Sequence, residues 1–169
     1  MGYKRDVSEI RNLGTCRVNH DGRDMGHTQG GCSVKITTQI REVVVDEYGV
    51  VPVDNVDQGT IIEVVTPLAQ ASWDNYVDAY PMGQTILAAN QLSFGRKVGD
   101  SLATARLVLD PLRVADDDGV VIYKAYVKDV AELGYNNEGE RIVAITWGGE
   151  IDTSRAAGDM CFRIFGGMS

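Results

Sequence analysis

The sequence has little of what most chemically specialised proteins need. Its 169 residues include only 4 prolines, 3 cysteines and 2 histidines. So few prolines exclude collagen and proline-rich linkers, and three cysteines without dense spacing indicate reduced thiols rather than a disulfide framework. Because both histidines fall in one predicted turn region, general acid–base catalysis has few candidate residues. We therefore expect a protein that is not an enzyme and needs no cofactor.

Long apolar runs are also missing. The longest uncharged stretch, residues 79–95, contains proline, glycine, glutamine and asparagine, so it does not predict a transmembrane segment. The first eleven residues include Lys4, Arg5, Asp6, Glu9 and Arg11, where a signal peptide would have its apolar core. We expect a protein that does not contact a membrane and is made in a reducing cytoplasm.

Basic residues are the minority among the charged ones. Sixteen basic residues against 24 acidic ones give a formal net charge of −8. Tight general binding to nucleic acid needs clustered lysine and arginine, which this balance disfavours. It remains compatible with a protein past which nucleic acid slides. The length and the 44% hydrophobic content predict a single globular domain over residues 1–169.

The clearest local pattern is a strict alternation over residues 32–41. One predicted face, the inner one, consists of Cys32, Val34, Ile36, Thr38 and Ile40. The other face consists of Ser33, Lys35, Thr37, Gln39 and Arg41. A period of two with β-branched residues on one side predicts a long amphipathic strand with one solvent-exposed face.

Further strands are predicted at 15–18, 60–65, 105–109, 120–130, 140–147 and 161–165. About eight strands with frequent turns predict a mainly-β protein, an antiparallel sandwich or barrel-like fold. One flanking helix is expected after Ser72, a good N-cap residue. Its core-facing stripe would be Trp73, Tyr76, Val77 and Tyr80, which recur at helical spacing.

Residues 42–59 are unusual because valines are set among acidic residues. Gly49, Pro52 and Gly59 interrupt any long strand, so the pattern predicts an extended loop. A loop of this length with apolar residues usually serves an interaction. The alternative is an ordinary hairpin tucked against the sheet.

The residues Cys16, His20, His27 and Cys32 lie close in the sequence and are ligand types that zinc accepts. Their spacing lacks the paired short knuckle of structural zinc sites. Strand cysteines and exposed turn histidines are the preferred interpretation, with no metal.

Two segments resemble the tail tube (major tail) proteins of tailed bacteriophages. In residues 25–81 the resemblance rests on Gly26, Thr28, Gly30, Gly31, Asp46, Tyr48, Gly49, Pro52, Val53, Asp54, Gly59, Pro67 and Leu68. Residues 141–167 resemble the closing strands of the same family.

The resemblance implies a virion structural protein, assembled in the host cytoplasm into the phage tail. Homohexameric rings would stack into a hollow tube, joined by tape-measure, terminator and distal tail proteins, and genomic DNA would pass through without specific binding. Residues 1–13 would form a flexible N-terminal arm, and the strand face from Ser33 to Arg41 would line the lumen. The residues expected to reach the adjacent ring are Val43, Val44, Val45, Asp46, Glu47, Tyr48, Gly49, Val50, Val51, Pro52, Val53 and Asp54.

Two alternatives stay open. One is another tail or neck component, or a secretion-tube homologue. The other is a monomeric β-sandwich module that binds carbohydrate or a receptor. An aromatic content of 7% weighs against the second, because such modules use a concave aromatic platform.

Overall fold

The computed structural model describes residues 16–86, 91–95, 98–112, 119–130 and 141–165. The N-terminal arm expected at residues 1–13 lies outside this part of the chain. Within it the protein is mainly β, with an antiparallel sheet and one α-helix, which confirms the predicted fold class.

The strands are β1 (Cys16–His20), β2 (Arg23–Asp24), β3 (Ser33–Val44), β4 (Pro52–Leu68), β5 (Gln84–Ile86), β6 (Gln91–Ser93), β7 (Ala105–Pro111), β8 (Gly119–Val130), β9 (Val143–Glu150) and β10 (Phe162–Phe165). The helix α1 spans Trp73–Ala79, and a short 3-10 turn, η2, spans Asp46–Tyr48.

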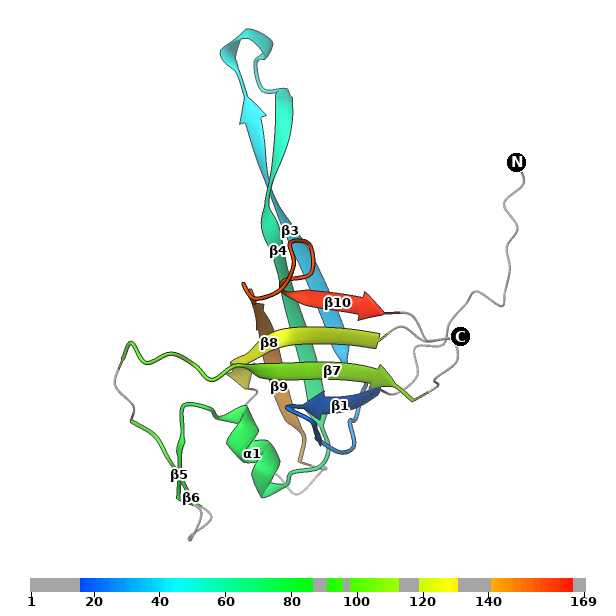
Figure 1. Ribbon diagram of the computed structural model, residues 1–169, viewed down its shortest axis with the longest axis vertical. Coiled ribbons are helices and arrows are strands. Elements are labelled where there is room, and N and C mark those ends of the chain that lie inside the picture. The colour runs from blue at the N-terminus through cyan, green and yellow to red at the C-terminus, as the bar shows by residue number, and fades with distance from the viewer. Residues whose placement is uncertain (1–15, 87–90, 96–97, 113–118, 131–140, 166–169) are drawn as a thin grey trace, which may run out of the picture.

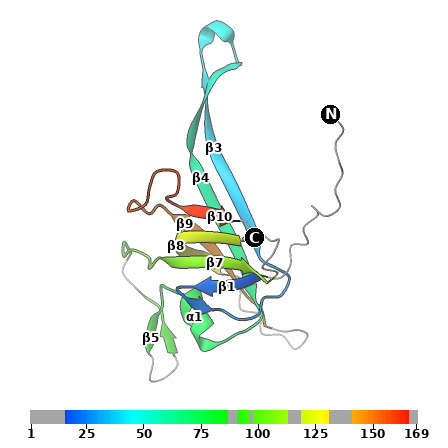
Figure 2. The same cartoon turned by 45° about the vertical axis from the view of Figure 1, so that its right-hand side comes forward.

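One sheet folds over on itself to enclose the core. Its order is β2-β1-β7-β8-β9-β4-β3, with β10 paired to β8, while β5 and β6 form a separate small hairpin. Register shifts interrupt the β7–β8 and β8–β9 pairs, and such irregularities help a sheet to bend. In Figure 1 and Figure 2, β1, β7, β8 and β10 cross over β4 and β9.

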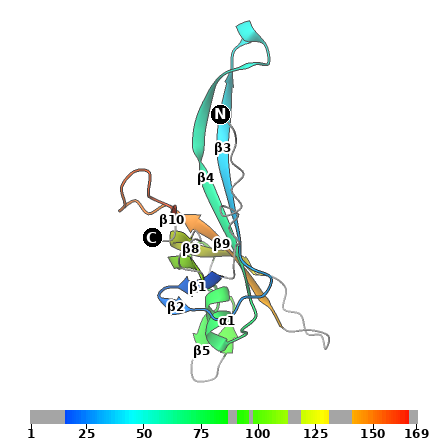
Figure 3. The same ribbon diagram turned by 90° about the vertical axis from the view of Figure 1, so that its right-hand side faces the viewer.

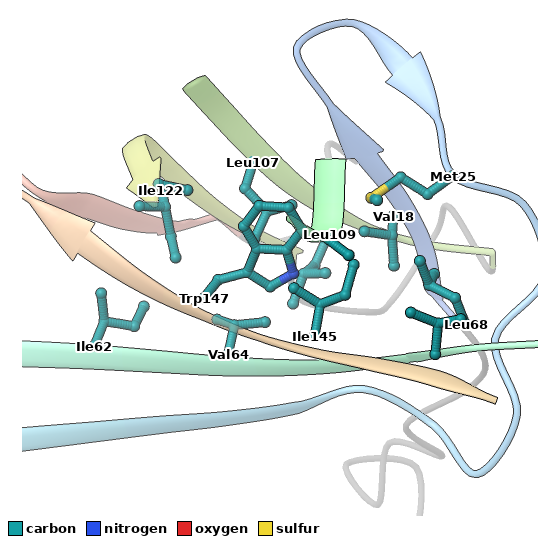
Figure 4. Packing of buried hydrophobic residues seen from close by; sticks show 13 residues of the cluster. Val18, Met25, Ile62, Val64, Leu68, Leu107, Leu109, Ile122, Ile145 and Trp147 are labelled. Atoms are coloured by element: carbon teal, nitrogen blue, oxygen red, sulfur yellow. The ribbon is translucent and has the colours of Figure 1, made fainter. Parts of the chain in front are cut away.

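The core lies between these two crossing layers (Figure 4). Ile62 and Val64 of β4 and Trp147 of β9 face Leu107 and Ile122 of the other layer, and all five are buried. Alternate residues of β7 and of the body end of β4 point inward, as the period of two requires.

Helix α1 begins where Ser72 predicts. The Ser72 side chain accepts a hydrogen bond from the backbone N–H of Asn75 at 3.3 Å, which caps the first turn. The fully buried helix residues are Asn75 and Ala79, which the predicted stripe did not contain.

The four stripe residues are only half-buried: Trp73, Tyr76, Val77 and Tyr80. Tyr76 and Tyr80 pack against the edge of the core. Hydrogen bonds explain why Asn75 is buried in place of the predicted stripe. The Asn75 amide donates to the carbonyl oxygens of Met25 (2.8 Å) and Gln70 (2.7 Å). A buried amide with those partners turns this face of the helix inward.

The structure corrects the prediction of an extended loop over residues 42–59. Residues 42–44 lie in β3 and residues 52–59 lie in β4, so only residues 45–51 form the connection. Gly59 does not end the strand; it lies beside a bulge instead. Gln58 is the extra residue there, opposite the step from Gln39 to Ile40, and the φ of Gly59 is +113°, which favours glycine. The hairpin does not tuck against the sheet; it projects away from it (Figure 3).

Candidate assembly surface on the β3–β4 hairpin

Among the described strands, the β3–β4 hairpin, residues 33–68, pairs with the body only through β4. β4 pairs with β9 only from Glu63 to Leu68. Over this segment Val64, Thr66 and Leu68 are buried, whereas residues 52–61 of the same strand are all exposed. The hairpin is therefore anchored at one end and free at the other (Figure 1).

The free end, residues 43–57, is here called the hairpin tip. Its two strands pair only with each other, for example Val43 opposite Asp54, and every residue except half-buried Val43 is exposed. An isolated two-stranded ribbon is marginal in water, since it has no further strand or core to pack on. A ribbon this exposed gains stability when another molecule covers it.

The turn of the tip is closed by a backbone hydrogen bond and exposes apolar side chains. The Tyr48 N–H donates to the Val45 carbonyl at 3.1 Å, and Gly49 takes a φ of +68°, which favours glycine. Tyr48 is 65% exposed and Val50 92% exposed. A protomer alone in water leaves this apolar surface hydrated at a free-energy cost.

The residues predicted to reach an adjacent ring all lie in this tip. Val43 and Val44 end β3, residues 45–51 form the turn, and Pro52, Val53 and Asp54 begin β4. The sequence missed Val56 and Ile61, which are also exposed apolar residues of β4. Their signal was weak because apolar and acidic residues share both faces of an exposed ribbon.

The inner face predicted for residues 32–41 is not covered as expected. Val34 and Ile36 are 38% and 42% exposed, although each lies directly opposite a buried partner, Val64 and Ile62. Directly opposite residues share a face of the sheet. The apolar surface of the core thus continues onto β3, where nothing in the described part of the chain covers it.

β3 is also the last strand of the sheet. The order ends at β3, so its outer edge has no strand partner among the described residues. A twelve-residue edge with an apolar face is a template for pairing with another chain, and proteins normally protect such edges.

The other face of β3, opposite the one that carries Val34 and Ile36, is the face predicted to line a lumen. Ser33, Lys35, Gln39 and Arg41 are exposed, and Thr37 is half-buried. Lys35 lies across from Glu63, whose carboxylate forms an ion pair with Lys128. The hydrogen bond from Lys128 lowers the pKa of Glu63, so this carboxylate stays charged. Three basic groups and one acidic group therefore make this patch basic rather than acidic.

The candidate metal ligands do not converge. Cys16 and Cys32 are neighbours, and a hydrogen bond from the Cys32 thiol lowers the pKa of Cys16 to about 7. His20 instead faces Asp78, with Nδ1 3.3 Å from the carboxylate, and its ring stacks on Trp147 at 4.7 Å between centroids. Across the described ranges, no three histidine, cysteine or acidic side chains are grouped to hold a metal ion.

No helix in the described ranges has the length and apolar character needed to cross a membrane. No protein-family model matches the chain, and no curated protein matches it. Its function is therefore inferred from the surfaces described above and from the resemblance noted in its sequence.

Proposed function

We propose that this protein is the structural subunit of a phage-type tail tube, in which hexameric rings stack into a hollow conduit for the genome. The observation that carries the proposal is the hairpin that projects from the body with apolar residues exposed. A protein that worked as a monomer would keep such surface small, because exposed apolar patches promote association.

Two separate surfaces support two kinds of contact between copies. The outer edge of β3 carries unpaired backbone groups beside the exposed side chains of Val34 and Ile36. Pairing of this edge with a different edge of a neighbour is a head-to-tail contact, which forms a ring when the rotation closes.

The hairpin tip supports contact along a second direction. It extends beyond every other described element in the views of Figures 1 to 3. A contact made by an element that far from the body joins the protomer to a copy in another layer. Rings linked in this way stack into a tube.

The face from Ser33 to Arg41 is the candidate lumen wall. Its side chains are polar or charged, which suits water and a passing polyanion. The basic side chains of Lys35 and Arg41 are few and separated along the strand, so DNA would pass without specific binding. Under this proposal the protein belongs to the virion and meets tape-measure, terminator and distal tail proteins at the ends of the tube.

The experiment is deletion of residues 43–57, which joins Glu42 to Gln58. The deletion leaves four residues between the paired residues Gln39 and Gly59, a length that hairpin connections tolerate. It removes no buried core residue. We expect the variant to fold with wild-type far-UV circular dichroism and to form no tubes in negative-stain electron microscopy of the concentrated protein.

A matched pair of point variants controls for the size of the deletion. Val50→Asp places a charge on the exposed tip, and Val98→Asp places the same charge on an equally exposed valine outside the hairpin. Only Val50→Asp is expected to prevent tube formation. Normal tubes from the deletion variant would show that the tip does not join rings. A wild-type protein that stays monomeric in sedimentation at every concentration would instead favour a binding module.

A further inference from the structure

The hairpin tip is acidic as well as apolar. Residues 43–57 include Asp46, Glu47, Asp54 and Asp57 and contain no lysine or arginine. All four carboxylates are exposed. Exposed carboxylates beside exposed valines need a partner surface that offers cations and apolar contacts together.

Within the described part of the chain, the tip has no such partner surface beside it. Figures 1 and 3 show it at the far end of the longest axis, away from β7, β8 and β10. β3 and β4 stay paired from the body to the turn, so the ribbon does not fold back. Docking of the tip on the described body therefore needs a second copy of the chain.

The body carries a hollow with suitable chemistry on the outer face of the sheet. Arg163 of β10 lies opposite Val121 of β8, which lies opposite Val108 of β7, while the next residues, Leu107 and Ile122, point into the core. The hollow, about 490 Å³ in volume, is here called the arginine hollow. Its lining includes Arg106, Val121, Tyr123, Arg155, Arg163 and Phe165.

Two of its arginines share a single carboxylate. The Asp159 side chain accepts hydrogen bonds from Tyr123 Oη (2.6 Å), from Arg155 Nη2 (2.7 Å) and from Arg163 Nη2. The hydrogen bond from Tyr123 and the two guanidinium groups lower the pKa of Asp159 to about 2. Arg155 also lies 3.6 Å from the centre of the Tyr123 ring. The cluster is pre-organised, and it has more donors than its carboxylate can satisfy.

The third arginine, Arg106, forms no ion pair with any described residue. No carboxylate in the described part of the chain lies within ion-pair distance of Arg106, which is exposed. Lys124 lies 3.5 Å from Asp152, which also lines the hollow. Arg106, Lys124, Arg155 and Arg163 against Asp152 and Asp159 leave an excess of two positive charges. This excess stands out on a chain whose net charge is −8.

We propose that the arginine hollow of one protomer receives the acidic tip of a neighbouring copy. The tip supplies carboxylates for Arg106 and the spare guanidinium donors, and its valines meet the apolar parts of the hollow. Each protomer has one tip and one hollow on different parts of its surface. Such a contact is head-to-tail and propagates from copy to copy. The inference rests on the proposed tube and names the surface on which the tip would seat.

Charge reversal tests the docking. Arg106→Glu should raise the protein concentration at which tubes first form by about tenfold or more, because a lost interfacial charge pair is replaced by repulsion. Adding Asp46→Lys and Glu47→Lys to that variant should lower the threshold again. Arg141→Glu, which makes the same charge change at an exposed site beside Tyr76, is the control and should stay close to wild type.

A chemical cross-link gives a readout that needs no variant. A carbodiimide joins a lysine amine to a carboxylate in contact with it, so tubes should yield peptides that link Lys124 to a tip carboxylate, and monomers should not. Tubes without this link, or equal thresholds for Arg106→Glu and Arg141→Glu, would overturn the docking while leaving the tube itself intact. Failure of the wild-type protein to form any tube would refute the proposed function as well.

Discussion

Replacing Thr66 by valine should weaken the anchor of the hairpin. Thr66 lies on β4 where that strand pairs with β9, and its side chain is fully buried. Its hydroxyl oxygen accepts a hydrogen bond from the Trp147 indole N–H at 2.9 Å. Valine has nearly the same shape, so the change removes this hydrogen bond, and the longer one that the hydroxyl donates to the Ile145 carbonyl at 3.4 Å, without opening a cavity.

The loss of stability follows from the Trp147 indole N–H, which the substitution leaves without its acceptor. A buried N–H without an acceptor costs about 1–3 kcal/mol of stability. For a domain of this size each kcal/mol corresponds to roughly 2–4 °C in Tm. Urea denaturation followed by circular dichroism measures the loss, and the variant lacking residues 43–57 is the right background because association would add to the apparent stability.

Two controls separate the hydrogen bond from other effects. Thr60→Val makes the same chemical change at an exposed site of the same strand and should alter stability by less than about 0.5 kcal/mol. In a Trp147→Phe background the Thr66→Val change should cost less, because no indole N–H remains to be orphaned. Equal costs for the Thr66 and Thr60 variants would refute the reasoning.

Two further predictions concern titrating groups. The hydrogen bond from Cys32 is the main cause of the pKa of about 7 for Cys16, whereas burial raises the pKa of Cys161. Iodoacetamide should therefore label Cys16 near neutral pH well before it labels Cys161. Peptide mass spectrometry measures the order, and faster labelling of Cys161 would contradict the prediction. Burial raises the pKa of Asp78, but hydrogen bonds and charges from its histidine and arginine partners outweigh this and lower the pKa overall. At pH values above about 3.9, the pKa of aspartate in the unfolded chain, Asp78→Asn should therefore lower the free energy of unfolding by about 1 kcal/mol. The difference in stability from wild type should disappear as the pH falls below that value. A difference that does not change with pH in urea titrations would contradict this.

Strands whose two faces differ in chemistry are predictable from the sequence. β7 and the body end of β4 alternate between core and surface, and burial of every second residue leaves a period of two in the sequence. β3 carries the same period because one of its exposed faces is apolar and the other polar. The distal arms of the β3–β4 hairpin have no buried face, so no such period exists there. Proline at position 52 predicts a break, yet Pro52 starts β4, a position where a missing N–H is tolerated.

The candidate site was found in part. The valines of the tip stood out because apolar residues among acidic ones are unusual. The uncovered face of β3 did not, since a period of two tells which residues share a face but not whether anything covers that face. The arginine hollow gave no local signal, because Arg106 and Arg163 are far apart in the sequence and only the pairing of β7, β8 and β10 brings them together.

The bulge at Gln58 gives the hairpin a mechanical joint. Four residues separate it from Glu63, the outermost β4 residue that pairs with β9, and Gly59 beside it has no atom within 4 Å of where a Cβ would stand. A second interruption lies nearer the turn, at the Val43–Val44 step. A ribbon held at one end bends most easily where its ladder is interrupted, so we expect the hairpin to bend at these two steps. In a stack of rings, such joints would let neighbouring layers tilt against one another.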